Sequence, residues 1–208
     1  PGCTTTRTSE IVMRIVAGRH RGRTLSVPQG CDLRPTADRV REAVFNMLAH
    51  GGGRGGGRGG GKPGGANVLI GARVLDAFAG TGAMGLEAIS RGALHATLID
   101  DDDAALACCR ANAAAMGEAA NVTVLLGDCL NPVRPAAPCS VVFLDPPYRS
   151  GLAPKALSAL RDAGWIADTA TCIAELAAKE PFAPPAGFAM LDERRYGAAR
   201  IVFVEPTG

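Results

Sequence analysis

The sequence predicts an α/β fold with a mostly parallel sheet of seven strands, helices on both of its faces and an antiparallel hairpin at its C-terminal end. Two observations favour this fold class. Beyond residue 66, short apolar runs alternate with helical segments, which is typical of a parallel sheet that is covered on both sides. An aspartate follows each of the first four runs, and ligands bind beyond the carboxyl ends of parallel strands. A hydrophobic content of 47% is sufficient for the core of such a domain.

Local patterns predict the elements in chain order. Residues 13–27 contain two short runs around a turn bounded by Gly18 and Gly22, which predicts a small N-terminal β-hairpin. Apolar residues recur at helical spacing from Val40 to Leu48, and Pro35 with Thr36 supplies a start signal for that helix. Strands are predicted over 72–80, 96–100, 122–128, 140–145 and 171–176, helices over 82–92, 104–117 and 156–164, and the closing hairpin over 187–205.

Composition divides the chain into four parts. Residues 1–12 form a Thr-rich leader that we expect to be disordered; a tag, a misassigned start and the remnant of an organellar transit peptide are alternative origins. Residues 13–50 carry the hairpin and the first helix. Residues 51–66 are rich in Gly and Arg, and such low complexity predicts a flexible linker. Residues 67–208, with the alternating strands and helices, are predicted to form the main domain.

The net charge of +2 is unevenly distributed. Residues 1–62 carry eleven Lys and Arg against four Asp and Glu, whereas the rest of the chain is acidic. A basic region on an acidic body favours contact with a polyanion, although a solvated basic arm without a partner is an equal alternative. The helix is expected to leave Arg39 and Arg41 pointing away from its apolar face. The candidate RNA-binding residues are Arg19, Arg21, Arg23, Arg34 and Arg39.

The cysteines and the apolar runs exclude other classes of protein. Seven cysteines contain no CxxC pair and leave one residue over under any pairing, which favours reduced thiols in an intracellular protein and no metal site. No apolar run approaches the roughly 20 residues that span a bilayer. We therefore expect a soluble protein with no membrane partner.

A glycine-rich loop follows the first strand of the predicted sheet. Gly80, Gly82 and Gly85 have the spacing of a dinucleotide fingerprint, and Asp100 stands 20 positions beyond Gly80, where a ribose-binding acid is expected. This pattern keeps an NAD-dependent oxidoreductase open. However, Asp76 would lie close to the two negative charges of a pyrophosphate. S-adenosylmethionine (SAM) presents an ammonium and a sulfonium there instead, so the charge favours SAM.

The fourth strand ends in the motif Asp145-Pro146-Pro147-Tyr148. A stiff surface turn is the simpler interpretation. The alternative is a rigid loop that binds a planar base: Asp145 and the Pro146 carbonyl accept the hydrogens of an exocyclic amine, and Tyr148 provides a stacking face. The prolines hold these groups in place before the substrate arrives. Aspartates are also common as caps of turns, which is the favoured interpretation for Asp128.

The motifs resemble those of a known superfamily. "VLDAFAGTGAMGLEAISRG", "ATLID", "GD" and "DPPY", in this order, resemble the class I SAM-dependent methyltransferases, whose fold is Rossmann-like. "MRIVAGRHRGRTLSVP", "LRPTADRVREAVFNML" and "LDPPYRSGL" resemble the RsmD family, the small-subunit ribosomal RNA guanine-N2 methyltransferases. The resemblance covers residues 13 to about 205 without the glycine-rich linker, which is not typical of the family.

The resemblance implies a role for each motif. The methionine end of SAM would contact Asp76, Phe78, Gly80 and Gly82, and the ribose hydroxyls would contact Asp100. Asp128 and Cys129 would hold the adenine edge of SAM. Residues 145–148 would hold the target base, and the helix that begins near Arg39 would cover the cofactor.

The implied reaction is direct methyl transfer from SAM to the N2 amine of a guanine in 16S ribosomal RNA, with no metal and no covalent intermediate. The partner would be this RNA or its assembling ribonucleoprotein particle. The protein would be a cytoplasmic monomer, or would act in a plastid or the mitochondrial matrix if the source is a eukaryote. Three alternatives stay open: an adenine-N6 methyltransferase with the same loop, an NAD-dependent oxidoreductase, and a catalytically silent RNA-binding assembly factor.

Overall fold

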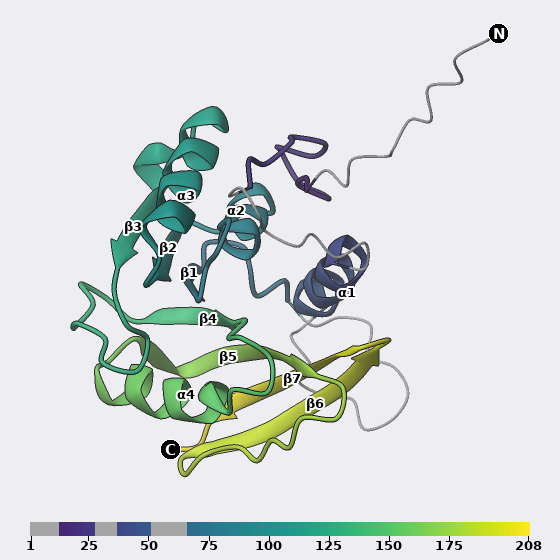
Figure 1. Cartoon of the computed structure of the whole chain (residues 1–208), viewed down its shortest axis with the longest axis vertical. Helices are drawn as coiled ribbons and strands as arrows, with labels where there is room; N and C mark the ends of the chain where they lie inside the picture. The colour runs from purple at the N-terminus through teal and green to yellow at the C-terminus, as the bar shows by residue number, and fades with distance from the viewer. Residues whose placement is uncertain (1–12, 28–36, 51–65) are drawn as a thin grey trace, which may run out of the picture.

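The computed structural model describes residues 13–27, 37–50 and 66–208 (Figure 1). The predictions for the leader, for Arg34, for the Pro35-Thr36 start signal and for residues 51–65 lie outside these ranges. No helix within the described ranges has the length and apolar composition that a membrane span requires.

The described residues form one seven-stranded sheet with the order β3-β2-β1-β4-β5-β7-β6. Strands β1 to β5 are parallel, and β7 runs antiparallel to both β5 and β6, so the predicted fold class is confirmed. The strand order reverses between β1 and β4, and open α/β sheets bind ligands at such a switch point. The strands are β1 (Arg73–Ala77), β2 (His95–Asp100), β3 (Val122–Leu126), β4 (Cys139–Leu144), β5 (Ile166–Ala177), β6 (Phe188–Tyr196) and β7 (Ala199–Pro206).

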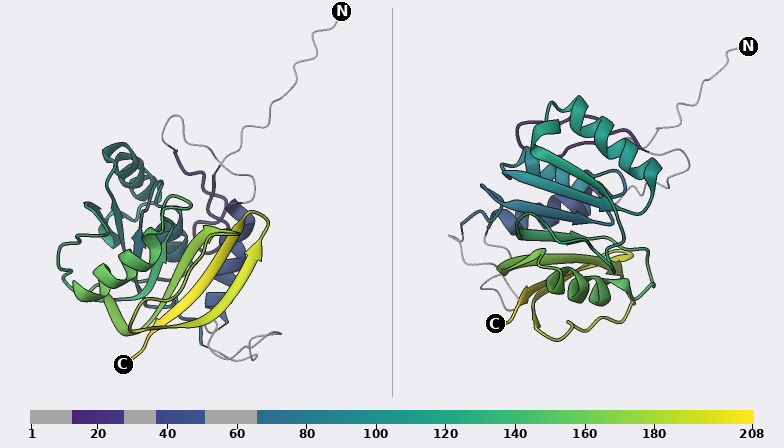
Figure 2. Two further views of the ribbon diagram at one scale, coloured as in Figure 1. Left: turned by 60° about the horizontal axis from the view of Figure 1, so that its bottom comes forward. Right: turned by 90° about the vertical axis from the view of Figure 1, so that its left-hand side faces the viewer.

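Helices cover the two faces of the sheet (Figure 2). The helices are α1 (Ala37–Ala49), α2 (Ala83–Ser90), α3 (Asp103–Ala115) and α4 (Leu152–Asp162), with a short 3-10 helix over Ala119–Asn121. Successive strand residues point to opposite faces. Val142 therefore packs with Leu157 of α4, whereas Val141 and Phe143 pack with Phe45 of α1 and Ile89 of α2.

Two elements begin four or five residues earlier than the sequence predicted. Strand β5 begins at Ile166, five residues earlier than predicted. The sequence pattern missed this part of the strand because the exposed Asp168 and Thr169 interrupt the apolar run. The register between β5 and β4 also shifts here, between Cys139 and Val141. Helix α4 begins at Leu152, and Pro154 lies in its first turn, where a missing amide donor costs no hydrogen bond.

The N-terminal hairpin is shorter than predicted. A single antiparallel bridge joins Arg14 to Thr24, where two strands were expected. The chain reversal is closed by hydrogen bonds from Ile15 N to Arg23 O (2.9 Å) and from Leu25 N to Met13 O (2.9 Å). The next amides, of Val16 and Ala17, donate to the Glu87 carboxylate at 2.7 and 3.0 Å. Because α2 takes these donors, strand pairing does not continue.

Gly18 fits a position that admits no side chain. Its φ is +84°, and a Cβ there would lie 2.0 Å from the Ser90 backbone oxygen. Gly22 has nearly the same φ of +83° but open space around it. Both lie in the hairpin, so they form a matched pair.

Replacing Gly18 with alanine is expected to destabilise the protein by more than the same change at Gly22. Gly22→Ala should cost about 1 to 2 kcal/mol, the penalty of a left-handed conformation. Gly18→Ala adds a backbone clash that separates the hairpin from α2. Urea unfolding of both variants measures the difference, and equal losses would show that the hairpin does not depend on this close approach.

Candidate active site

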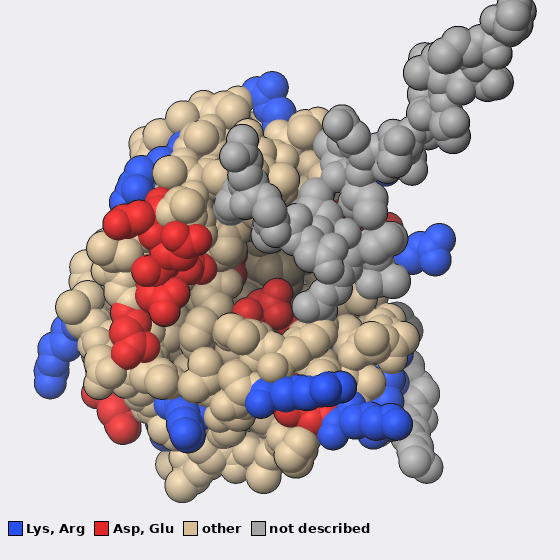
Figure 3. All heavy atoms as spheres, in the orientation of Figure 1, with Lys and Arg blue, Asp and Glu red and all other residues tan. Residues whose placement is uncertain are grey.

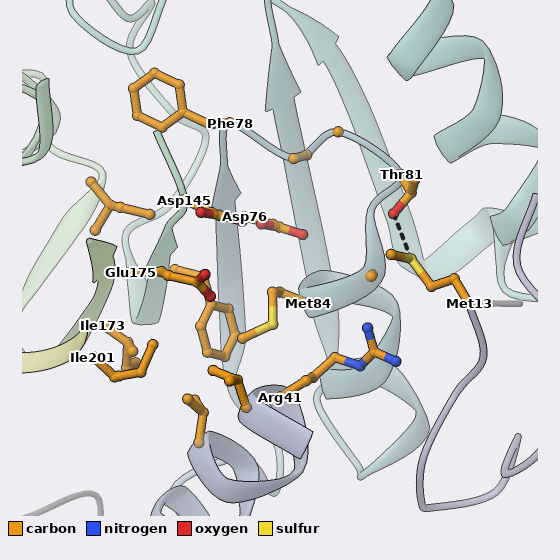
Figure 4. Close-up of a pocket in the computed structure, with 17 residues that line it drawn as sticks. Met13, Arg41, Asp76, Phe78, Thr81, Met84, Asp145, Ile173, Glu175 and Ile201 are labelled. Atoms are coloured by element: carbon orange, nitrogen blue, oxygen red, sulfur yellow. Dashed lines mark hydrogen bonds between the residues drawn. The ribbon is translucent and has the colours of Figure 1, made fainter. Parts of the chain in front are cut away.

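A cavity of ≈ 240 Å³ lies at the carboxyl ends of β1, β4 and β5 (Figure 4). Asp76 of β1, Asp145 after β4 and Glu175 of β5 line it, and α1 contributes Val40 and Arg41. Figure 3 shows acidic side chains beside and within a hollow of this face, with basic side chains toward its margins. The switch point of the sheet therefore carries an acidic cavity.

Asp76 is the most deeply buried acid of this cavity. Its side chain is 2% exposed, and its Oδ2 accepts a hydrogen bond from Gly85 N at 2.8 Å. A Cβ at Gly85 would lie 2.3 Å from Leu98 Cδ2, so glycine lets α2 approach β1 and β2 closely. Burial raises the pKa of Asp76 to about 7, with a smaller contribution from Asp100, although donation from Gly85 N opposes this rise. Asp76 is thus poised to change charge near neutral pH.

The glycine loop and Asp100 are joined directly. Asp100 Oδ2 accepts from Gly80 N at 2.7 Å, and Asp100 Oδ1 accepts from Asp102 N at 3.0 Å. The two residues stand 20 positions apart in the chain. The structure therefore brings the two residues together, and the Asp100 carboxylate holds the loop backbone; its ribose contact stays a prediction. Asp100 does not line the cavity itself.

Asp128 and Cys129 lie away from the cavity. Asp128 accepts hydrogen bonds from Leu130 N and from Asn131 Nδ2, both at 2.7 Å, and these bonds lower the pKa of its carboxyl. The Cys129 side chain packs in the core, where burial raises the pKa of its thiol to about 12. Asp128 thus caps the turn after β3, and the adenine contact of these two residues stays a prediction.

The Asp-Pro-Pro-Tyr loop continues β4 at the edge of the cavity. Asp145 N donates to Ala77 O at 3.4 Å, which keeps the start of the loop beside the end of β1. Pro146 is buried, whereas Asp145 and Pro147 are exposed. Tyr148 is half-buried, and its hydroxyl donates to Glu175 Oε1 at 2.6 Å. The loop therefore places the Asp145 carboxylate in the cavity wall and joins the Tyr148 hydroxyl to Glu175, which also lines the cavity.

Glu180 anchors the far end of this loop, a role that the sequence did not reveal. Its Oε2 accepts from Arg149 N at 2.8 Å and from Ala177 N at 3.2 Å, and its Oε1 accepts from Gly151 N at 3.3 Å. Burial raises the pKa of Glu180, but these donors and Arg200 outweigh it and lower that pKa below its usual range. A buried carboxylate thus holds the backbone directly after Tyr148.

Both non-glycine residues with positive φ in the described part of the chain lie at this site. Phe78, which follows β1, has a φ of +63°, and Arg149, which follows Tyr148, has a φ of +59°. Such conformations cost on the order of 1 to 3 kcal/mol and cluster at functional sites. The two strained residues lie beside the glycine loop and directly after the Asp-Pro-Pro-Tyr motif.

The structure separates the candidate RNA-binding arginines into two groups. Arg19 Nε donates to Glu118 Oε1 at 2.9 Å, and Arg23 donates to Ala115 O at 2.5 Å, so these side chains hold the hairpin against α3. Arg21 and Arg39 are exposed and border a shared cavity of ≈ 420 Å³ between the hairpin and α1. Arg34 lies outside the described residues.

Arg41 is not directed away from the protein as expected. Its side chain is 4% exposed and donates to Asp38 Oδ1 at 2.8 Å and to Arg14 O at 2.5 Å. The reason lies on α2, where the fully buried Glu87 carboxylate is 3.8 Å from Arg41 Nε. An arginine on this helix face thus enters the wall of the cavity.

The described cysteines (Cys108, Cys109, Cys129, Cys139 and Cys172) are all free thiols. Within residues 13–27, 37–50 and 66–208, no group of three or more His, Cys, Asp and Glu side chains is placed to hold a metal ion.

Comparison with known proteins agrees with this architecture. A family model described as "Conserved hypothetical protein 95" matches residues 13–205. The ribosomal RNA small subunit methyltransferase D of Escherichia coli is 40% identical over 164 residues, which cover 78% of this chain and 74% of that protein. The Haemophilus influenzae protein of the same name is 31% identical over 191 residues, with 89% of each chain covered.

The solved structures carry the same fold. One from Escherichia coli, assigned as a methyltransferase, has a TM-score of 0.76 and 36% identity, and covers 94% of this chain and 98% of its own. Another from Haemophilus influenzae, assigned as a methylase, has a TM-score of 0.72 and 26% identity. It covers 95% of this chain and 99% of its own. The range of the family model, residues 13–205, includes the hairpin, α1 and strands β1 to β6. The chain therefore belongs to the family of the ribosomal RNA small subunit methyltransferase D proteins, within the class I methyltransferase fold.

Proposed function

We propose that the protein transfers the methyl group of SAM to the exocyclic N2 amine of a guanine in small-subunit ribosomal RNA. One observation carries this proposal: a single cavity is lined by Asp76 of β1, by Gly80 of the glycine loop and by Asp145 of the Asp-Pro-Pro-Tyr loop. A cofactor on the glycine loop and a base on the second loop would meet there. The family relatives support the methyl transfer and the RNA substrate.

The residues around the glycine loop fit SAM. The Asp76 carboxylate lines the cavity and offers a negative charge to the ammonium or sulfonium of SAM. A Cβ at Gly80 would meet no atom within 4 Å, so the loop leaves open space beside its backbone. Asp100, whose carboxylate accepts from Gly80 N, would accept from the ribose of a cofactor on the same loop. SAM supplies an activated methyl group on a cationic sulfur.

The second loop would hold and orient the base. The lone pair of an exocyclic guanine amine is delocalised into the ring, so the nitrogen is a weak nucleophile. Asp145 and the Pro146 carbonyl accept its two hydrogens and direct the nitrogen toward the methyl group. The negative charge of Asp145 stabilises the amine as it becomes cationic. Glu180 keeps the loop in this conformation through the amides of Arg149 and Gly151.

The alternatives are not favoured. An NAD-dependent oxidoreductase would place a pyrophosphate near the buried Asp76 carboxylate, which repels it when ionised. An adenine-N6 methyltransferase and a silent assembly factor share the fold, but the relatives at 40% and 31% identity are named as ribosomal RNA methyltransferases. Guanine N2 therefore stays the proposed target.

The decisive experiment is incubation of the protein with methyl-labelled SAM and small-subunit ribosomal RNA, both free and in assembling particles. Mapping of the label by mass spectrometry should find N2-methylguanosine at one position. Label found in N6-methyladenosine would show that the target is adenine N6 and not guanine N2. Absence of transfer to any RNA would overturn the proposed function. A parallel titration with NADH should show no binding.

The raised pKa of Asp76 predicts a pH dependence of SAM binding. The pKa of Asp76 is about 7, so at a pH below this value the carboxyl is mainly neutral and loses its attraction to the cofactor. The ammonium of SAM stays protonated in this range, because α-amino groups titrate near about 7.7 to 8.0. SAM affinity should therefore weaken as the pH falls from about 7 to 5.5, approaching a tenfold loss per pH unit. Calorimetric titration measures this, and Asp76→Asn should bind weakly with a flat profile.

The exposed arginines predict a change in the salt dependence of RNA binding. Replacing Arg21 and Arg39 with alanine should reduce the slope of log affinity against log salt by about one unit for each lost phosphate contact. SAM affinity should not change. Arg195→Ala is the matched control, because Arg195 is an exposed arginine on β6. An unchanged slope in the double variant would remove these arginines from the RNA interface.

A further inference from the structure

A second carboxylate stands beside Asp145 at the strand ends. Strands β4 and β5 are parallel, and Leu144 pairs with Ala174. The next residues along the two strands are Asp145 and Glu175, and both line the cavity. Figure 4 shows their side chains reaching into the same space. Glu175 has no role in the reaction as described so far.

Tyr148 holds this carboxylate in one orientation. The tyrosine hydroxyl donates to Glu175 Oε1 at 2.6 Å. An ionised carboxylate has two oxygens and accepts several hydrogen bonds, so this contact leaves acceptor capacity for a ligand. A base stacked against the Tyr148 ring would therefore present its edge to both Asp145 and Glu175.

Guanine and adenine differ at the atom next to the reacting amine. Guanine carries N1–H beside its N2 amine, so its Watson–Crick edge offers adjacent donors. Adenine carries a bare N1, an acceptor, beside its N6 amine. A carboxylate that faces this atom attracts guanine and repels adenine. Two neighbouring carboxylates thus match guanine, whereas Asp145 alone holds either amine.

We infer that Glu175 reads the N1–H of the target base and selects guanine over adenine. This inference rests on the proposed function. Glu175 is half-buried, and the neighbouring apolar side chains of Phe143, Ile173 and Ile201 line the cavity with it. A bound adenine would exclude water from this space and leave its N1 acceptor facing the Glu175 carboxylate. Neither acceptor would then have a hydrogen-bond donor, which is costly. Sites built to hydrogen-bond one edge reject analogues that lack the matching donor.

The test uses an analogue that keeps the reacting amine. RNA is prepared with guanine or 2,6-diaminopurine at the methylated position; diaminopurine retains the N2 amine but has a bare N1. Methylation of both RNAs is measured for the unaltered protein and for Glu175→Gln. The glutamine amide offers an N–H to the bare N1 and an oxygen to the Tyr148 hydroxyl. We expect the ratio of kcat/KM for guanine over diaminopurine to fall at least about tenfold in Glu175→Gln.

Tyr148→Phe separates base reading from a purely positional role. It removes the hydroxyl that holds Glu175 but keeps the ring and the carboxylate, so activity should fall on both RNAs together and leave the ratio within about twofold. Equal losses on both RNAs in Glu175→Gln would overturn the inference alone. Failure of the unaltered protein to methylate the guanine RNA would overturn the proposed function and the inference with it.

Discussion

Replacing Asp145 with asparagine is expected to lower kcat at least about a hundredfold, the scale of a lost electrostatic stabiliser. Asparagine keeps the size and one acceptor oxygen, but it loses the negative charge that favours the amine as it becomes cationic. Interactions made mainly in the transition state affect kcat and leave ground-state binding largely unchanged. The measurements are N2-methylguanosine formed per RNA over time and a calorimetric SAM titration, in which the affinity should stay near that of the unaltered protein.

Asp100→Ala is the complementary variant. Asp100 holds Gly80 N at 2.7 Å and does not line the cavity with Asp145. Its loss should weaken SAM binding while turnover at saturating SAM is retained. An Asp145→Asn protein that methylates at the unaltered rate would show that the Asp-Pro-Pro-Tyr loop does not act on the amine as proposed.

Removing the Glu87 carboxylate is expected to destabilise the protein by about 3 to 5 kcal/mol, the cost of breaking a buried ion pair. Glu87 is fully buried, and its Oε1 accepts from Arg91 Nε at 2.6 Å. Arg41 and Arg91 are 4% and 11% exposed, so Glu87→Ala leaves both guanidinium groups buried without their shared acid. The hairpin also loses the acceptor of two backbone amides. Urea unfolding and thermal melts measure the change, with an expected drop in Tm on the order of 10 °C.

Arg195→Ala serves as the control for Glu87. Arg195 lies on β6 and its Nε is 3.6 Å from Glu193 Oε1, where the two side chains are 67% and 35% exposed. Exposed ion pairs contribute about 0 to 1 kcal/mol. Similar losses in the two variants would show that the Glu87 cluster contributes no more to stability than a surface pair.

The sequence predicted the strands that carry the cavity because their signals are local. The run that ends in Asp76 and the run that ends in Asp145 are apolar throughout, since both faces of these strands are covered. Acids at their ends then fall at one edge of the sheet, whatever the lengths of the connections. The glycine spacing predicted Asp100 as a ribose-binding acid; the structure shows its carboxylate accepting from Gly80 N, and the ribose contact stays a prediction.

Two acids near the cavity were not found in the sequence: Glu175, which lines it, and Glu180, which holds the loop after Tyr148. Glu175 lies inside a predicted strand, where its register to Asp145 depends on which strand is the neighbour of β4. Glu180 follows that strand by a few residues and reads as a surface charge. Only the pairing of β5 with β4 and β7 brings it under the amides of Arg149 and Gly151.

By itself, the sequence determined the fold class, the glycine loop and the position of the Asp-Pro-Pro-Tyr motif at a strand end, because periodicity, turn chemistry and strand ends depend on neighbouring residues. The tertiary structure alone decided which charges are buried. Arg41 and Glu87 stand far apart in the chain, and a basic residue on a helix reads as solvated until an acid on another helix pairs with it. Arg19 stays about half exposed and pairs with the buried Glu118, a contact between distant residues that the sequence did not indicate; its RNA contact stays a prediction. A buried charge needs an oppositely charged or hydrogen-bonding partner. When that partner is distant in the chain, only long-range packing brings it close, so the neighbouring residues in the sequence do not reveal it.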